Sequence, residues 1–167
     1  TALADDPMLT VRLQEPQQAL PPLRVVLDTM GRLPPRLKLF DGSAPTLAVH
    51  AVDVVPGYED DVRALALPRD GELLDLRALL AQLAQREINE VQVEAGATLS
   101  GALLRANLVD EVLLYLAPVL LGDAGLPLFA NLGIDSMEQR FGMQVVDTRQ
   151  VGPDLRLLLR PKPAEAA

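Results

Sequence analysis

Short apolar runs alternate along this chain with stripes of helical spacing, and this alternation limits its possible folds more than any other feature. Val- and Leu-rich runs occupy residues 23–27, 45–49 and 62–67, and runs of this length and composition are typical of buried strands. After Asp75, a candidate N-cap, the period becomes helical, with apolar residues at i, i+3, i+4 and i+7: Leu76, Leu79, Leu80 and Leu83. We predict a helix that ends near Ile88 and Asn89.

The second half of the chain continues in the same way. Residues 90–94 are strand-like, and a second helical stripe follows, with Leu99, Ala102, Leu103 and Ala106 before a candidate stop at Asn107. Residues 111–117 are apolar on both faces, which predicts a central strand covered by helices on both sides. Residues 141–160 predict two strands joined by a turn at Gly152. The whole pattern predicts an α/β domain, with a mainly parallel sheet and an antiparallel C-terminal hairpin.

Composition narrows the possible functions. The 167 residues suffice for one domain with its own core, and the absence of Cys excludes disulfides, zinc–thiolate sites, iron–sulfur clusters and thiol nucleophiles. The single histidine, His50, excludes a His-rich metal site, and its place at the end of an apolar run favours a structural role over that of a base. A net charge of -8 and 3% aromatic residues argue against a nucleic-acid partner. No apolar run approaches the roughly 18 residues of a membrane helix, so we expect no membrane partner and a cytoplasmic location.

A segment of small residues joins the 90–94 run to the second helix. At such a junction backbone N–H groups can approach a phosphate, and the helix N-terminus adds partial positive charge. The segment lacks the Gly-Lys-Ser/Thr of a Walker A loop and the second Gly of the G-x-G-x-x-G fingerprint. The pattern alone therefore leaves a ligand cradle and a tight packing turn both open. Glu94, at the end of the run, is either a functional carboxylate or a solvated one.

Charged residues also gather near the start of the chain. Asp5 and Asp6 precede Pro7, and Arg12 follows. Adjacent carboxylates can ligate Mg²⁺, and an Arg can bind a phosphate through two hydrogen bonds. The residues by themselves favour the simpler interpretation, a helix start or turn with solvated charges.

Five motifs, taken together and in order, resemble those of a known family. They are TALADDPMLTVR (1–12), LRVVLDT (23–29), VEAGATL (93–99), LVDE (108–111) and LAPVLLG (116–122). They are similar to T-x-L-A-D-D-P-x-L-T-V-R, R-V-V-L-D-S, V-E-G-G-x-x-L, L-V-D-E and A-P-x-x-L-G of the reductase domain of bacterial bifunctional riboflavin-biosynthesis deaminase–reductases. The match runs from Thr1 to about Arg160, nearly the whole chain.

The resemblance implies a dihydrofolate-reductase-like, three-layer α/β/α fold and a hydride transfer. NADPH would reduce the ribose of 5-amino-6-(5-phosphoribosylamino)uracil, a phosphorylated pyrimidine, to a ribityl chain. The motifs imply substrate contacts at Leu9, Arg12 and Glu94. They imply cofactor contacts at Thr1, Asp5, Thr29, Gly96, Ala97, Thr98, Leu99, Ser100, Gly101 and Ala102. They single out no catalytic residue.

The sequence departs from the family pattern in three ways. Ala95 stands in place of a loop Gly, where a methyl group disfavours positive φ, and Thr29 stands in place of Ser. The family's opening strand, with its K-x-A-x-S-L-D-G signature, does not occur in the sequence. We expect residues 1–160 to form a reductase domain without its opening strands, which binds NADPH weakly by itself, and residues 161–167 to form a disordered tail.

Two partners and two alternative functions complete the expectations. The resemblance implies fusion to a zinc deaminase domain in the parent protein, and the apolar strands suit a homodimer. The alternatives are a non-catalytic dimerisation or regulatory domain of the same fold, and a reductase of another pteridine-like substrate.

Overall fold

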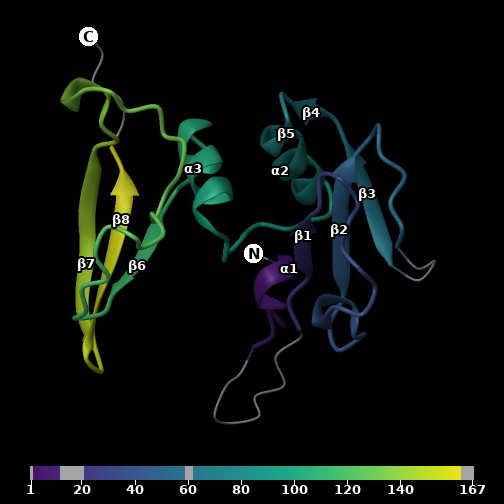
Figure 1. The fold of residues 1–167 in the computed structure, drawn as a ribbon, viewed down its shortest axis with the longest axis horizontal. Coiled ribbons are helices and arrows are strands. Elements are labelled where there is room, and N and C mark those ends of the chain that lie inside the picture. Colours follow the sequence, from purple (N-terminus) through teal and green to yellow (C-terminus); the bar gives the residue numbers. More distant parts are fainter. Residues whose placement is uncertain (1, 12–20, 59–61, 163–167) are drawn as a thin grey trace. The chain divides into compact units, whose positions relative to one another are not determined.

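The computed structural model describes residues 2–11, 21–58 and 62–162, and the chain divides into two compact units, Thr1–Val91 and Gln92–Ala167. Figure 1 shows the elements of both units, coloured along the sequence. No helix among the described residues is long and apolar enough to cross a membrane.

The first unit is built on a parallel sheet. Its elements are α1 (Ala2–Asp5), β1 (Arg24–Leu27), the 3₁₀ turn η1 (Lys38–Phe40), β2 (Thr46–Ala51), β3 (Arg63–Leu67), β4 (Arg69–Asp70), β5 (Leu73–Leu74) and α2 (Leu76–Ala84). β2 lies between β1 and β3, and both ladders are parallel. The three strands therefore end at the same edge of the sheet, which is where parallel sheets place their ligands.

The core lies on both faces of β2, which is buried from Leu47 to Ala51. Alternate side chains of a strand face opposite sides. Leu47 and Val49 pack with Leu79 and Leu83 of α2, whereas Ala48 packs with a second cluster: Val26, Leu33, Leu37 and Leu39. Ala2 and Leu9 pack against this second cluster, so the N-terminal segment covers the face opposite α2.

The first predicted helix is confirmed as α2, including its N-cap. The Asp75 carboxylate accepts hydrogen bonds from the backbone N–H groups of Arg77 and Ala78, both at 2.9 Å. The helix ends at Ala84, earlier than the predicted end near Ile88. Glu87 takes a left-handed φ of 62°, and the N–H of Ile88 donates to the Leu83 carbonyl at 3.2 Å. Ile88 is thus part of a helix-ending turn that returns its side chain to the core.

The second unit contains an antiparallel sheet. Its elements are α3 (Ala97–Arg105), β6 (Val112–Leu116), the 3₁₀ turn η2 (Met137–Gln139), β7 (Met143–Val151) and β8 (Asp154–Pro161). β7 and β8 form the predicted hairpin around Gly152, with a register irregularity between Val145 and Asp147. The sheet order is β6-β8-β7, and β6 pairs antiparallel with β8.

Two predictions for this half of the chain are wrong. β6 is an edge strand among the described residues, and Leu113 and Tyr115 are each about half exposed, at 52% and 51%. An apolar sequence does not distinguish an edge strand from a central one, because the ladder partners decide that. Residues 90–94 form no strand, since no described strand pairs with them; Val91 and Val93 remain 42% and 46% exposed. The expected combination of a parallel sheet and an antiparallel hairpin is confirmed.

Candidate active site

The N-terminal segment of the first unit is held in an unusual conformation. α1 ends at Asp5, and Asp6 and Leu9 both have left-handed φ angles, 41° and 47°. The Asp6 carboxylate accepts a hydrogen bond from the Lys38 backbone N–H at 2.9 Å and lies 3.6 Å from the Lys38 Nζ. Asp6 is therefore an anchor for a turn; the simpler interpretation predicted the turn, but the Asp6 carboxylate is paired with Lys38 rather than solvated. The neighbouring Asp5 is exposed.

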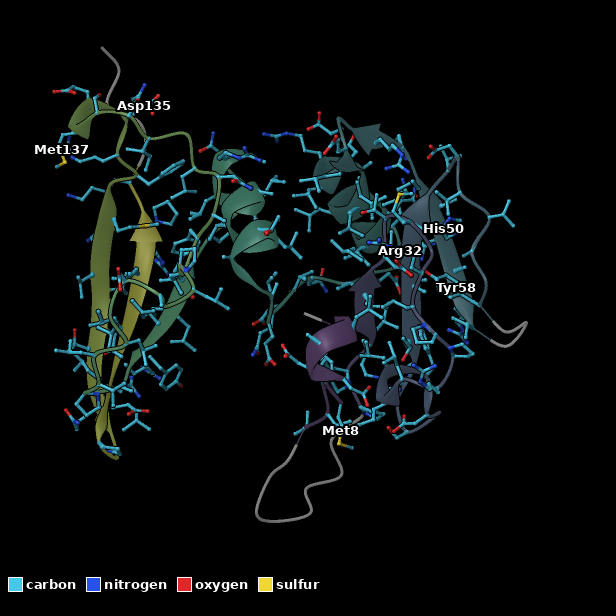
Figure 2. All side chains as sticks on the ribbon, in the orientation of Figure 1. Met8, Arg32, His50, Tyr58, Asp135 and Met137 are labelled. Carbon is cyan, nitrogen blue, oxygen red and sulfur yellow. The ribbon has the colours of Figure 1, made fainter. Side chains whose placement is uncertain are left out.

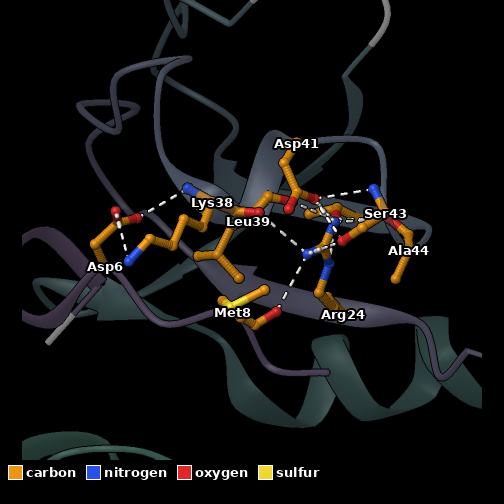
Figure 3. A network of polar contacts seen from close by, with 9 residues as sticks. Asp6, Met8, Arg24, Lys38, Leu39, Asp41, Ser43 and Ala44 are labelled. Atoms are coloured by element: carbon orange, nitrogen blue, oxygen red, sulfur yellow. Dashed lines mark hydrogen bonds and ion pairs between the residues drawn. The ribbon is translucent and has the colours of Figure 1, made fainter. Parts of the chain in front are cut away.

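Arg24, at the start of β1, also holds this N-terminal segment in place, through hydrogen bonds from its buried side chain. Its side chain is 0% exposed. Six oxygens accept hydrogen bonds from its guanidinium: Thr46 Oγ1 (2.9 Å), Met8 O (3.2 Å), Lys38 O (3.1 Å), Ser43 Oγ (3.4 Å), Asp41 Oδ1 (3.2 Å) and Ala44 O (2.8 Å) (Figure 3). Hydrogen bonds from Ser43, stronger here than the effect of Arg24, hold the pKa of Asp41 below its usual value. The guanidinium thus ties the N-terminal segment to the 38–46 segment and to β2.

The carboxyl edge of the parallel sheet carries a second polar group. The buried Asp28, directly after β1, accepts hydrogen bonds from the Leu33 N–H at 2.8 Å and from the Tyr58 hydroxyl at 2.9 Å. Burial of the Tyr58 side chain, aided by its hydrogen bond to Asp28, raises the pKa of Tyr58. The half-buried Thr29 follows, and its carbonyl accepts from the Ala51 N–H at 3.2 Å. Asp28 therefore orients the turn that presents Thr29.

His50 lies beside this group and is packed rather than exposed. Its ring meets the ring of Tyr58 edge-on, with centroids 6.2 Å apart, and both residues are labelled in Figure 2. Its Nδ1 lies 3.0 Å from the Ala51 carbonyl oxygen, which can only accept a hydrogen bond, so Nδ1 donates. The geometry favours the structural role that the sequence indicated. No group of three or more acidic or histidine side chains gathers in the described ranges as a metal-ligand set.

In the second unit, the sequence-predicted cradle is the start of α3. Gly96 is the N-cap in an extended conformation, and no side chain caps the helix. The first N–H groups of α3, at Ala97, Thr98 and Leu99, have no partner among the described residues. Unpaired N–H groups at a helix N-terminus suit a phosphate, so this end of the segment fits a dinucleotide cofactor. Thr98 is the most exposed residue of this turn.

The other end of the predicted cradle serves packing. A Cβ at Gly101 would collide with the Ala130 carbonyl oxygen and come within 3.1 Å of two further backbone atoms of Ala130. The Ala130 N–H also donates to the Ala97 carbonyl at 2.9 Å. Gly101 and Ala102 are buried within the unit. The start of the segment, at Ala97–Leu99, thus supports the interpretation as a ligand cradle, and Gly101 supports the interpretation as a tight packing turn.

The remaining predicted substrate and cofactor contacts are placed as follows. Leu9 is half-buried in the N-terminal turn, and Glu94 is exposed, accepting a hydrogen bond from the Gln92 side chain at 2.8 Å. Leu99 and Ser100 are half-buried on the first turn of α3. Thr1 and Arg12 lie outside the described residues.

Sequence comparison identifies the family. The model of the RibD C-terminal domain matches residues 1–157. The chain belongs to the RibD C-terminal domain family. It is 38% identical to riboflavin biosynthesis protein RibD of Escherichia coli, over 95% of this chain and 46% of that protein. It is 31% identical to a protein of Buchnera aphidicola named 5-amino-6-(5-phosphoribosylamino)uracil reductase, over 97% of this chain and 83% of that one.

Solved structures agree with this assignment. The structure of Acinetobacter baumannii RibD superposes with a TM-score of 0.82 and 32% identity, over 96% of this chain and 44% of that one. The RibD C-terminal domain described here thus has the dihydrofolate-reductase-like α/β fold that the motifs implied. It spans about half of the length of the RibD proteins that it matches.

The sequence analysis missed the residues that hold the site in place. The sequence indicated no separate role for Arg24, Asp28 or Tyr58, and it offered Asp6 only as a Mg²⁺ ligand or as a solvated charge on a turn. A signal was present, because Arg24 and Asp28 bracket the apolar run 25–27. Charges next to a buried strand are buried with it, and buried charges need partners.

Proposed function

We propose that this domain is the reductase of 5-amino-6-(5-phosphoribosylamino)uracil in riboflavin biosynthesis and that it uses NADPH. The observation that carries the proposal is the match to the Buchnera protein named for this reaction, because the chain covers 83% of that protein. A relative that consists mostly of this domain leaves little other chain to which its activity could belong.

By resemblance, cofactor contacts are assigned within each unit separately. In the first unit they are Thr1, Asp5 and Thr29. In the second unit the unpaired N–H groups at the start of α3 and the Thr98 hydroxyl are assigned to the cofactor's phosphates. When bound, NADPH would supply a hydride to the anomeric carbon of the ring-opened ribosylamine, a C1′=N imine whose former ring oxygen has become a hydroxyl; the imine nitrogen takes a proton, which gives the ribityl amine.

By resemblance, substrate contacts are assigned to Leu9 and Arg12 in the first unit and to Glu94 in the second. Arg12 is assigned to the 5′-phosphate by resemblance, since a guanidinium matches phosphate geometry. The Gln92 side chain donates to Oε1 of Glu94, and Oε2 has no partner among the described residues. That oxygen can accept a hydrogen bond from a ribose hydroxyl or a ring N–H, which orients the substrate.

The test uses the full-length protein and follows NADPH oxidation at 340 nm with the pyrimidine substrate. We expect substrate-dependent oxidation and formation of the ribityl product. Glu94→Gln should lower kcat/KM about 10- to 100-fold, the effect of one lost charged hydrogen bond. Glu90→Gln is the matched control, because Glu90 is also exposed on the same irregular segment. Absence of product with the unmodified protein would refute the proposed function.

Four expectations stay predictions: the homodimer, the fused zinc deaminase domain, the cytoplasmic location and the disordered tail at 161–167. Pro161 is the last residue of β8, and residues 163–167 lie outside the described chain. Light scattering measures whether the protein is a dimer, and fluorescence titration measures whether it binds NADPH; together they test the non-catalytic alternative. A dimer that binds no nucleotide would favour that alternative over the reductase.

A further inference from the structure

The N-terminal turn concentrates backbone strain in a short stretch. Asp6 and Leu9 both adopt left-handed φ angles although neither is glycine. Such a conformation costs about 1–3 kcal/mol per residue and persists only where the surroundings enforce it. Strained residues of this kind gather at ligand sites and switches.

Two polar anchors enforce the turn, one at each end. At its start, the Asp6 carboxylate binds the backbone N–H of Lys38 at 2.9 Å. At its end, the buried guanidinium of Arg24 donates to the Met8 carbonyl at 3.2 Å and to the Lys38 carbonyl at 3.1 Å. Figure 3 shows both anchors converging on the Lys38 backbone from opposite sides. The turn and the 38–46 segment are thus held to each other through polar contacts.

The anchors determine where neighbouring side chains point. Asp5 immediately precedes Asp6, and its exposed carboxylate has no partner among the described residues, so the backbone alone sets its direction. Leu9 immediately follows the anchored Met8 carbonyl, and its left-handed φ turns its side chain toward the second core cluster. Without the anchors, Asp6 and Leu9 would relax toward ordinary backbone angles, and the neighbouring Asp5 would move with them.

We propose that Arg24 and Asp6 are positioning residues, which hold the 6–9 turn in the conformation that ligand binding requires. The inference rests on the proposed function, in which Asp5 contacts the cofactor and Leu9 the substrate. When the turn is in the binding-competent conformation only part of the time, the apparent affinity for the ligand falls in proportion to that fraction. Loss of an anchor therefore weakens binding and leaves the rate at saturation unchanged.

The test measures NADPH affinity by fluorescence titration, together with KM, kcat and the melting temperature, in the full-length protein. Asp6→Ala removes one anchor at the partly exposed side of the turn. We expect Kd for NADPH and the substrate KM to rise about 5- to 20-fold, with kcat within about twofold, the pattern of a reduced competent fraction. Asp6→Asn keeps an oxygen acceptor for the Lys38 N–H, so it should restore most of the affinity.

Controls separate positioning from general destabilisation. Asp53→Ala breaks a comparable surface ion pair, Arg69 Nε to Asp53 Oδ1 at 2.9 Å, in the same unit; its Kd and KM should match the unmodified protein. Arg24→Lys keeps the buried charge with fewer donors and should raise Kd and KM as Asp6→Ala does. If Asp6→Ala and Arg24→Lys both bind NADPH and substrate as the unmodified protein does, the inference is wrong while the proposed function stands. If the unmodified protein binds no NADPH, the proposed function fails and the inference falls with it.

Discussion

Gly101 offers the sharpest test of how α3 is packed. It lies inside the helix, where replacing Gly by Ala ordinarily stabilises a protein by up to about 1 kcal/mol. Here the added Cβ would collide with the carbonyl oxygen of Ala130, far inside the 3.0 Å limit that real Cβ atoms respect. The neighbour is backbone, so no side-chain rotation relieves the contact. We expect Gly101→Ala to destabilise the protein, the reverse of the usual sign.

The size of the effect follows from three contributions. The 130 segment must withdraw by over an ångström to reach ordinary contact, and overpacking of this kind costs about 1–3 kcal/mol. Withdrawal also strains the hydrogen bond from the Ala130 N–H to the Ala97 carbonyl, whose net value is about 1 kcal/mol. The helix propensity of Ala returns about 1 kcal/mol. The net loss is about 2 kcal/mol, or roughly 4–8 °C in Tm for a chain of this size.

Thermal unfolding followed by circular dichroism measures this loss. Gly142→Ala is the matched control in the same unit, because a Cβ there would meet only Lys162 side-chain atoms, at 3.6 Å or more. Gly142→Ala should leave Tm within about 2 °C, the shift expected for a change of about 0.5 kcal/mol. A Gly101→Ala protein as stable as the unmodified one would refute the packing role assigned to this glycine.

Three further predictions concern buried or paired charges. Arg24→Met leaves the buried acceptors without their donor and should lower the free energy of unfolding by about 3 kcal/mol in urea titrations; a loss below about 1 kcal/mol would contradict the buried network. Burial raises the pKa of Asp147, but Arg156 and Arg149 outweigh it and lower the pKa below 3.8. The ionised carboxylate therefore stabilises the fold above about pH 4, and this contribution is lost as the pH falls through the lowered folded pKa. Asp147→Asn should therefore flatten the fall of Tm below about pH 4. Burial and the hydrogen bond to Asp28 raise the pKa of Tyr58 above 10.0, so the unfolded chain loses this proton first and stability falls above about pH 10. Tyr58→Phe should weaken that fall, measured as Tm against pH.

Local signals in the sequence predicted much of the first unit correctly. The strands β1, β2 and β3 and the N-cap Asp75 depend on period, composition and a single side chain, all of which can be read from a few neighbouring residues. The strand predicted at 90–94 did not form, because strand formation needs a ladder partner that composition does not specify. β6 failed as a central strand for the same reason.

The site shows the same division between local and distant information. The free N–H groups at the start of α3 follow from a local feature, a helix that begins after Gly96. The role of Gly101 depends on Ala130, which lies far away in the sequence. A glycine in a motif is equally compatible with close approach of a ligand and close approach of backbone, and only the fold decides between them.

Asp5 and Asp6 illustrate why a motif cannot be read as a uniform binding surface. The two carboxylates are adjacent, yet Asp5 faces solvent and Asp6 binds the Lys38 backbone. The anchored carboxylate, together with Arg24, fixes the strained backbone that aims the free one. Under the proposed function, the ligand contact at Asp5 and the support of that contact at Asp6 are thus encoded at neighbouring positions. We therefore expect a chain that kept Asp5 but lost Asp6 to retain the proposed contact group without the backbone geometry that orients it.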